Sequence, residues 1–127
     1  MPQIETKIIY KDLSYTLNGL FFKVHNDLGR FRNEKIYADY LEKLLIESNI
    51  KYARETSIEP SFEGEKVGRN RPDFIIEDKI IIDLKAKNMI SKEDYFQMKR
   101  YLDSSKKRLG IIVNFRSIHI YPKRVAN

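Results

Sequence analysis

The chain has 127 residues, of which 42% are hydrophobic and 12% aromatic, a composition that excludes a disordered chain and predicts one folded domain spanning residues 1–127. It contains no cysteine, which excludes a disulfide framework and a thiolate metal site and favours a reducing, cytoplasmic location. No apolar run approaches the ~18 residues of a membrane span, and the first residues lack the hydrophobic stretch of a signal peptide, so we expect no membrane partner.

Positive charge is concentrated in the second half of the chain. Residues 1–64 contain nine lysines and arginines and ten acidic residues, whereas residues 65–127 contain fifteen and eight. The formal net charge of the whole chain is +6. Such asymmetry is typical of a surface that faces a polyanion, most often nucleic acid. A solvated basic face that only keeps the protein soluble explains the charge about equally well.

The first half of the chain predicts two helices and two extended segments. Hydrophobic residues recur every three to four positions over residues 13–28, which predicts an amphipathic helix that ends at Gly29. The same spacing over residues 33–48 predicts a second helix. Residues 51–54 and 57–63 are expected to be extended.

The second half of the chain predicts a hairpin, a third helix and two closing strands. The expected strands are residues 69–76, 80–86, 109–115 and 118–121. The helix is expected over residues 92–104, after Ser91, whose side chain is suited to cap it. The order α-α-β-β-β-α-β-β indicates an α/β fold with a mixed central β-sheet flanked by α-helices.

Acidic residues interrupt the hydrophobic hairpin at one end. If its turn comprises residues 77–79, Asp73 lies directly opposite Asp83, with Cβ atoms ~5 Å apart. A two-residue turn would instead place these two side chains on opposite faces. Opposed carboxylates are compatible with a hard cation such as Mg²⁺ between them. Lys85 faces the same side as Asp83, where it could orient or deprotonate an attacking water, or stabilise charge that develops on a phosphate.

A known signature appears at these positions. The Pro-Asp pair at 72–73, followed after nine residues by Asp-Leu-Lys at 83–85, resembles the PD-(D/E)xK signature of the restriction-endonuclease-like nuclease superfamily. The (D/E)xK triplet alone is unspecific, because residues 5–7 and 77–79 also match it. The flanking strands and the Pro-Asp pair at hairpin distance distinguish the match at 83–85. The resemblance implies a single restriction-endonuclease-like domain.

Two further features fit this superfamily. Glu34 lies on or beside the apolar stripe of the second predicted helix, and superfamily members commonly bring a glutamate from such a helix to the metal site. A glutamate in a first turn also stabilises a helix N-terminus, which is the simpler interpretation. Gln97 and Tyr101, four residues apart on the third predicted helix, resemble the QxxxY motif of the exonuclease-like branch. A surface glutamine beside a core tyrosine gives the same spacing.

The order of the motifs is similar to that of one family within the superfamily, the small bacterial GxxExxY proteins. Gly29, Glu34 and Tyr37 precede the PD…DLK pair, the Gln-to-Tyr motif and then the segment 110–115 follow it, and together these motifs cover nearly the whole chain. The chain departs from the family at Phe31, which stands between two arginines where the family has a glycine. This substitution leaves the path of the loop into the second helix open.

The resemblance implies a nuclease that hydrolyses phosphodiester bonds in nucleic acid, with DNA expected, by a water activated by Mg²⁺ or, alternatively, Mn²⁺. The catalytic residues would then be Lys85, Asp83, Asp73 and Glu34, with the three acids as metal ligands and with Gln97 and Tyr101 in support. Candidate phosphate contacts are Arg69, Arg71 and Lys87.

A second hypothesis is a nucleic-acid-binding or partner-binding module that has the same fold but does not cleave. The Asp/Asp/Lys set favours the nuclease, whereas the altered glycine favours the binding module. A domain this small often needs a second copy to hold a duplex, so a homodimer is a further expectation. The sequence leaves open DNA versus RNA, single versus double strand, and endonuclease versus exonuclease.

Overall fold

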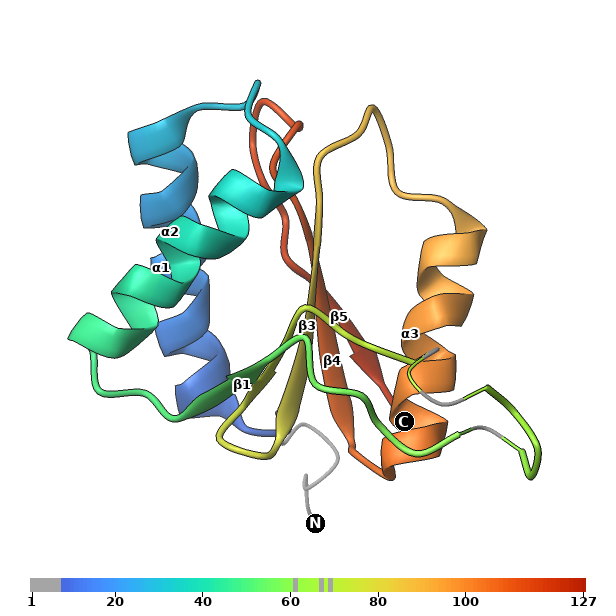
Figure 1. Cartoon of the computed structure of the whole chain (residues 1–127). Helices are drawn as coiled ribbons and strands as arrows, with labels where there is room; N and C mark the ends of the chain where they lie inside the picture. The colour runs from blue at the N-terminus through green and yellow to red at the C-terminus, as the bar shows by residue number, and fades with distance from the viewer. Residues whose placement is uncertain (1–7, 61, 67, 69) are drawn as a thin grey trace, which may run out of the picture.

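The computed structural model describes residues 8–60, 62–66, 68 and 70–127. This part of the chain contains three α-helices and five β-strands. The helices are α1 (Lys11–Leu28), α2 (Glu34–Glu47) and α3 (Lys92–Ser105). The strands are β1 (Tyr52–Arg54), β2 (Phe74–Ile76), β3 (Ile80–Lys85), β4 (Leu109–Asn114) and β5 (Lys123–Ala126). Their order along the chain confirms the predicted α-α-β-β-β-α-β-β sequence (Figure 1).

The strands form one mixed sheet in the order β1-β2-β3-β4-β5. β3 and β4 pair in parallel, while the three other pairs are antiparallel. A parallel pair needs a crossover connection, and here α3 provides it between β3 and β4. Figure 1 shows α1 and α2 on one side of the sheet and α3 on the other. In the described residues, none of the helices has the length and apolar content that a membrane crossing requires.

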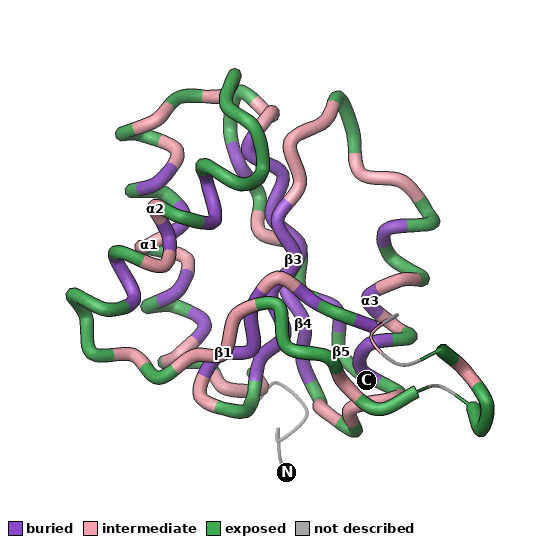
Figure 2. Tube along the Cα trace, in the orientation of Figure 1, coloured by how far each residue is buried: buried purple, intermediate pink, exposed green. Residues whose placement is uncertain are grey.

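Each face of the sheet has its own hydrophobic core, and Figure 2 shows buried residues along the strands between the helices. Ile80, Ile82 and Leu84 of β3 belong to the larger core, together with residues of α1 and α2. Ile81 belongs to the smaller core, which contains Met98 of α3. Because side chains alternate along a strand, Asp83 and the lysine two residues further on point to the α3 face.

α3 packs very closely on β4 at a glycine. A Cβ atom added at Gly110 would lie 2.2 Å from the Sδ atom of Met98, which is fully buried. Any side chain at this position would therefore force the Met98 side chain, or α3 with it, to shift. The close contact holds the residues of α3 within reach of the end of β3.

The hairpin register confirms the expected three-residue turn. Ile76 pairs with Ile80, and Phe74 pairs with Ile82. Glu77 and Asp78 have φ angles of 53° and 57°, the left-handed conformation that two-residue primed turns require, and Lys79 completes the loop as a third residue. One step beyond the ladder, Asp73 is opposite Asp83, as the sequence predicts.

The strand predicted at residues 118–121 is wrong, whereas residues 57–63, which were expected to be extended, are simply not part of a strand in their described part. Residues 118–121 form no strand, and β5 follows them instead, with Lys123 paired to Ile112. The apolar character of this segment reflects Ile120, which is 3% exposed in the α1/α2 core, rather than strand pairing. The predicted strand 69–76 is shorter, since β2 begins only at Phe74.

Candidate active site

Two aspartates and a lysine lie together where β2 begins and β3 ends. Asp83 is buried within β3, and Asp73 stands directly before β2. The Nζ atom of Lys85 lies 3.0 Å from Oδ2 of Asp83. Lys85 also donates a hydrogen bond of 3.2 Å to Oε1 of Gln97, which α3 brings over the sheet. The structure therefore gathers four of the predicted residues on the α3 face.

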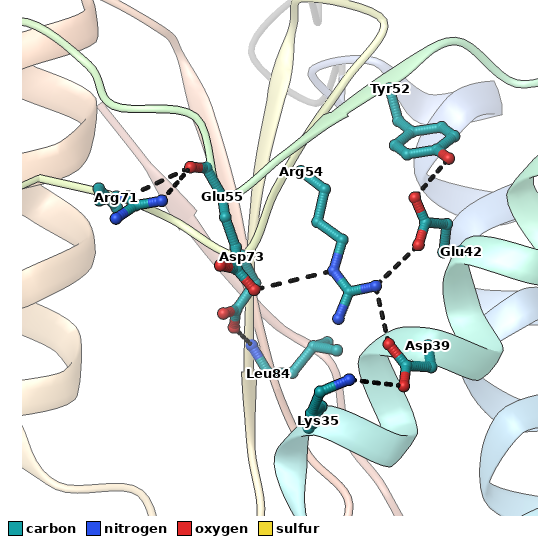
Figure 3. A network of polar contacts seen from close by, with 9 residues as sticks. All are labelled: Lys35, Asp39, Glu42, Tyr52, Arg54, Glu55, Arg71, Asp73 and Leu84. Carbon is teal, nitrogen blue, oxygen red and sulfur yellow. Dashed lines mark hydrogen bonds and ion pairs between the residues drawn. The ribbon is translucent and has the colours of Figure 1, made fainter. Parts of the chain in front are cut away.

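Asp73 has a pKa well above the usual range of a carboxyl group. Burial and the neighbouring charge of Asp83 raise the pKa of Asp73 to about 7, although the backbone N–H of Leu84 counteracts this. That N–H donates to Oδ2 of Asp73 over 2.6 Å (Figure 3). The hydrogen bond fixes the direction of the carboxyl group but does not compensate the repulsion between the two acids. Without a cation, the pair therefore holds a proton at near-neutral pH.

One oxygen of this acid pair is only incompletely satisfied. Oδ2 of Asp83 is buried and has no well-aligned hydrogen-bond donor in the described residues. Its contact with the ammonium of Lys85, 3.0 Å away, is an ion pair without hydrogen-bond geometry. A buried carboxylate oxygen in this situation is costly, and binding a cation would remove the cost.

The two carboxylates are hard oxygen donors of the kind that divalent cations such as Mg²⁺ and Mn²⁺ bind. Mg²⁺ prefers one or two carboxylates and completes its shell with waters and phosphate oxygens, whereas Ca²⁺ takes six to eight oxygen ligands and structural Zn²⁺ takes four protein ligands. Asp73 and Asp83 supply two carboxylates. The described residues contain no group of three or more His, Cys, Asp or Glu side chains arranged to hold a metal. Two protein ligands and a free outer side suit a metal that is shared with substrate phosphate.

Glu34 is near this pair but does not join it in a three-acid cluster. It is the first residue of α2, where the side chain of Asn33 accepts a 2.9 Å hydrogen bond from the backbone N–H of Ile36 and caps the helix. Glu34 is exposed, and its negative charge contributes to the raised pKa values of Asp73 and Lys85. It therefore faces the site from α2, and its role as a metal ligand stays a prediction.

Lys85 is held as an ammonium. Burial favours its neutral form, but the charges of Asp83 and Asp94 together outweigh burial and raise the pKa of Lys85 above its usual value. Oδ1 of Asp94 lies 3.6 Å from Nζ of Lys85, and the Gln97 contact completes its surroundings. In this state the lysine can donate hydrogen bonds and stabilise negative charge, so its surroundings favour an electrostatic role over proton abstraction.

Asp94 is a site residue that the sequence analysis missed. Its Oδ2 atom lies 2.5 Å from Nζ of Lys87 and accepts a 2.8 Å hydrogen bond from the backbone N–H of Ser91. Asp94 thus completes a capping box at the start of α3 and also contacts both lysines, including Lys85. The Ser-x-x-Asp pattern at residues 91–94 marks the cap, but nothing in the sequence relates it to the lysines.

Tyr101 lies at the inner side of the site. It is 5% exposed and belongs to the core under α3. Burial and the charge of Asp83 raise the pKa of Tyr101 to about 12, so its hydroxyl keeps its proton beside the acid pair. The geometry of the QxxxY motif is therefore consistent with both earlier interpretations: Gln97 contacts Lys85 directly, and Tyr101 also packs in the core.

The predicted phosphate contacts have other partners where the structure describes them. Arg71 donates from Nε and Nη2 to the backbone carbonyl of Glu55, at 3.2 and 3.1 Å. Lys87 is paired with Asp94. Arg69 lies outside the described residues. Arg71 and Lys87 are thus fixed in position beside the site, and their contact with phosphate stays a prediction.

A second polar network ties α2 to the edge of the sheet, as Figure 3 shows. Nη1 of Arg54 in β1 lies 2.7 Å from Oε1 of Glu42 and 2.9 Å from Oδ1 of Asp39, both in α2. The hydroxyl of Tyr52 also donates to Glu42. Next to Arg54, the backbone N–H of Glu55 donates to the carbonyl of Asp73. The network therefore fixes α2, which begins with the predicted glutamate, relative to the acid pair.

Comparison of the sequence with protein-family models gives a match. The family model described as the PD-(D/E)XK nuclease superfamily aligns with residues 11–125. The chain belongs to this superfamily. Neither the curated proteins nor the solved structures contain a match to it.

Membership in the PD-(D/E)XK nuclease superfamily confirms the predicted restriction-endonuclease-like fold and supports a nuclease-type function. The signature residues at 72–73 and 83–85 occupy the start of β2 and the end of β3, and the mixed five-stranded sheet agrees with this fold class. The narrower resemblance to the GxxExxY proteins stays a prediction.

Proposed function

We propose that this protein is a Mg²⁺-dependent nuclease that hydrolyses phosphodiester bonds, with DNA as the expected polymer. The observation that supports it most strongly is the convergence of Asp73 and Asp83 beside Lys85, which raises the pKa of Asp73 to about 7 and places the ammonium 3.0 Å from Asp83. Repulsion between two neighbouring buried acids is a cost that folding alone does not explain.

In this proposal Asp73 and Asp83 hold the metal. A bound Mg²⁺ would neutralise charge on the phosphate and lower the pKa of an attacking water, and Mn²⁺ would serve similarly. The ammonium of Lys85, held by Gln97 and the two aspartates around it, donates to the phosphate or orients the water. Glu34 approaches from α2 and adds a further carboxylate once substrate and metal are bound.

The altered glycine position does not disturb the loop before α2. The hydroxyl of Tyr37 donates a 2.6 Å hydrogen bond to the carbonyl of Gly29 and accepts one from the backbone N–H of Arg32. Phe31 is not among the residues with positive φ, so it needs no glycine-like conformation. The loop geometry is therefore compatible with the nuclease proposal, and the non-catalytic binding module is an outcome of the test below.

The test is digestion of end-labelled single-stranded DNA, duplex DNA and RNA by the purified protein with Mg²⁺, Mn²⁺ or EDTA. We expect cleavage that needs the metal and that is lost in Lys85→Ala and Asp83→Asn. Lys79→Ala is the matched control, because Lys79 ends the second internal match to the same triplet, at residues 77–79, and lies on the exposed turn. Binding of nucleic acid without cleavage of any substrate would instead identify a binding module.

A further inference from the structure

An exposed aromatic ring lies between two arginines on the loop that joins α1 to α2. Phe31 is 75% exposed. The guanidinium carbon of Arg30 is 4.6 Å from the centroid of its ring, and that of Arg116, from the connection between β4 and β5, is 5.8 Å from it. Single exposed apolar side chains are common on protein surfaces, and what distinguishes Phe31 is the pair of guanidinium groups beside its ring.

Hydrogen bonds fix the loop that carries the Phe31 ring. Nε of Arg30 donates to the carbonyl of Arg116 and Nε of Arg116 donates to the carbonyl of Arg30, both at 2.7 Å. His25 of α1 adds a 2.9 Å hydrogen bond from Nε2 to the carbonyl of Ser117. Figure 1 shows the two connections next to each other at one end of the sheet. These three bonds hold the α1–α2 loop to the β4–β5 connection.

Both arginines keep donors and charge for a ligand. Each guanidinium has five N–H donors, and the reciprocal bonds use only the Nε donor of each. In the described part of the chain, neither Arg30 nor Arg116 has a carboxylate partner, whereas Lys87 and Arg54 do. An aromatic face with two uncompensated guanidinium groups presents stacking and anion binding side by side.

This surface borders the candidate active site. The backbone N–H of Phe115 donates to the carbonyl of Lys85, so Arg116, the next residue after Phe115, lies near the end of β3. On the other side, Phe31 precedes Glu34 by three residues, and the charge of Glu34 acts on Asp73. The α1–α2 loop and the end of β3 therefore lie at the same end of the sheet (Figure 1).

We propose that Phe31, with Arg30 and Arg116, binds an unpaired nucleobase of the substrate strand and the phosphates beside it. This inference deepens the proposed nuclease function and rests on it. Bases inside a duplex are already stacked and cannot cover the ring, so the bound strand is single-stranded, frayed or locally opened there. Aromatic rings and arginines along a single strand are the usual means of binding it without sequence preference. An acidic protein segment would use the arginines but would not need the flat ring.

The absence of tryptophan from the chain allows a direct test. Phe31→Trp introduces a single tryptophan at the ring position, which can be excited selectively over the tyrosines, and the measurement is made in EDTA so that no cleavage occurs. We expect a short single-stranded DNA to quench this fluorescence, and the same strand without bases at its central positions to quench it much less. Equal quenching by both strands would overturn the proposal. Quenching by poly-glutamate but not by DNA would overturn it in favour of a protein partner.

A second measurement does not depend on the added tryptophan. Phe31→Ala should weaken binding of single-stranded DNA in EDTA by about 10-fold, with a smaller effect on a blunt duplex. Tyr15→Ala is the matched control, because Tyr15 is 81% exposed but lies on α1 about 20 Å before the loop. The control should bind like the wild type. Unchanged binding in a folded Phe31→Ala, or an equal loss in both variants, would refute the inference.

The outcome is separable from that of the proposed function. If cleavage with Mg²⁺ is absent but Phe31→Ala still weakens single-strand binding, the nuclease proposal fails and the nucleobase contact stands as part of a binding module. If cleavage is present and Phe31→Ala binds and cleaves like the wild type, only the nucleobase contact fails.

Discussion

At the scale of single residues, Asp73 experiences opposing influences. Burial and the charge of Asp83 favour its protonated form, whereas the 2.6 Å hydrogen bond from Leu84 favours the carboxylate. The balance places its pKa at about 7, far above ~3.9 in an unfolded chain. The folded state thus binds a proton more tightly than the unfolded state. Stability therefore falls as pH rises from about 4 to about 7 and changes little above that.

Asp73→Asn tests this balance, since the amide keeps an acceptor for the N–H of Leu84 but loses the charge. We expect its free energy of unfolding without metal to exceed that of the wild type by ~2 kcal/mol at about pH 8, and to differ little at about pH 4. Urea unfolding at the two pH values measures it. Asp78→Asn, on the exposed turn, should show no such gain. A destabilised Asp73→Asn at about pH 8 would show that the acids do not repel each other.

Asp94 combines two roles that substitution can separate. Asp94→Asn keeps an acceptor for the helix cap but removes the charge beside Lys85 and Lys87. If Asp94 positions Lys85, cleavage should fall by ~10- to 100-fold in kcat, with little change in KM. Ser91→Ala is the control: it weakens the cap by ~1 kcal/mol but leaves both lysine contacts. Equal activity losses in the two variants would mean that Asp94 acts only through the helix.

At the scale of elements, the distance between α3 and the sheet sets the reach of Gln97 and Asp94. This distance depends on Gly110, where an added Cβ would lie 2.2 Å from Sδ and 2.7 Å from Cγ of Met98. Met98 is fully buried and has little room to move. The contact therefore couples core packing directly to the geometry around Lys85.

Gly110→Ala should reduce stability by ~1–3 kcal/mol and reduce cleavage beyond what partial unfolding explains, because the Met98 side chain, or α3 with it, must shift. Gly19→Ala is the matched control. Gly19 lies inside α1, a Cβ there would meet nothing within 4 Å, and alanine favours a helix by up to ~1 kcal/mol. Thermal unfolding and cleavage rates measure both effects. Full activity in Gly110→Ala would show that the site tolerates this shift.

The sequence predicts those elements whose signal is local. The hairpin register follows from the β-branched runs and the polar turn at 77–79, and it correctly places Asp73 opposite Asp83. The strand predicted at 118–121 is wrong because Ile120 is apolar for burial under α1 and α2, not for pairing. A single sequence does not separate these two reasons for an apolar residue.

The residues of the candidate site also divide into those that the sequence predicts and those that it does not. Asp83 and Lys85 share one strand, so their spacing alone places them on one face. Asp94 and Arg54 escaped prediction because they meet Lys85 and Glu42, 9 and 12 residues away in sequence, only through packing. Where a residue's role depends on which helix covers which face, the local pattern carries no signal for it.

At the scale of the whole molecule, the question is where the excess positive charge acts. Several basic residues are already paired within the protein, including Lys87 and Lys107. The site lies at the end of β3, whereas Arg108 directly precedes β4, at the opposite end of this parallel pair. Arg71 stands two residues before Asp73. Arg71 and Arg108 therefore carry the same charge at different distances from the site.

Comparison of Arg71→Gln with Arg108→Gln distinguishes a localised docking surface from a generally basic protein, because each substitution lowers the net charge equally. Binding of single-stranded DNA in EDTA should weaken with salt, and each phosphate contact contributes about −0.7 to the slope of log K against log salt. We expect Arg71→Gln to reduce the slope by about one such contact and Arg108→Gln to leave it unchanged. Fluorescence anisotropy over a salt series measures both slopes. Equal slopes in the two variants would mean that the basic half of the chain serves solubility. A phosphate bound near the site would contact Arg71 but not Arg108, so it would give different slopes.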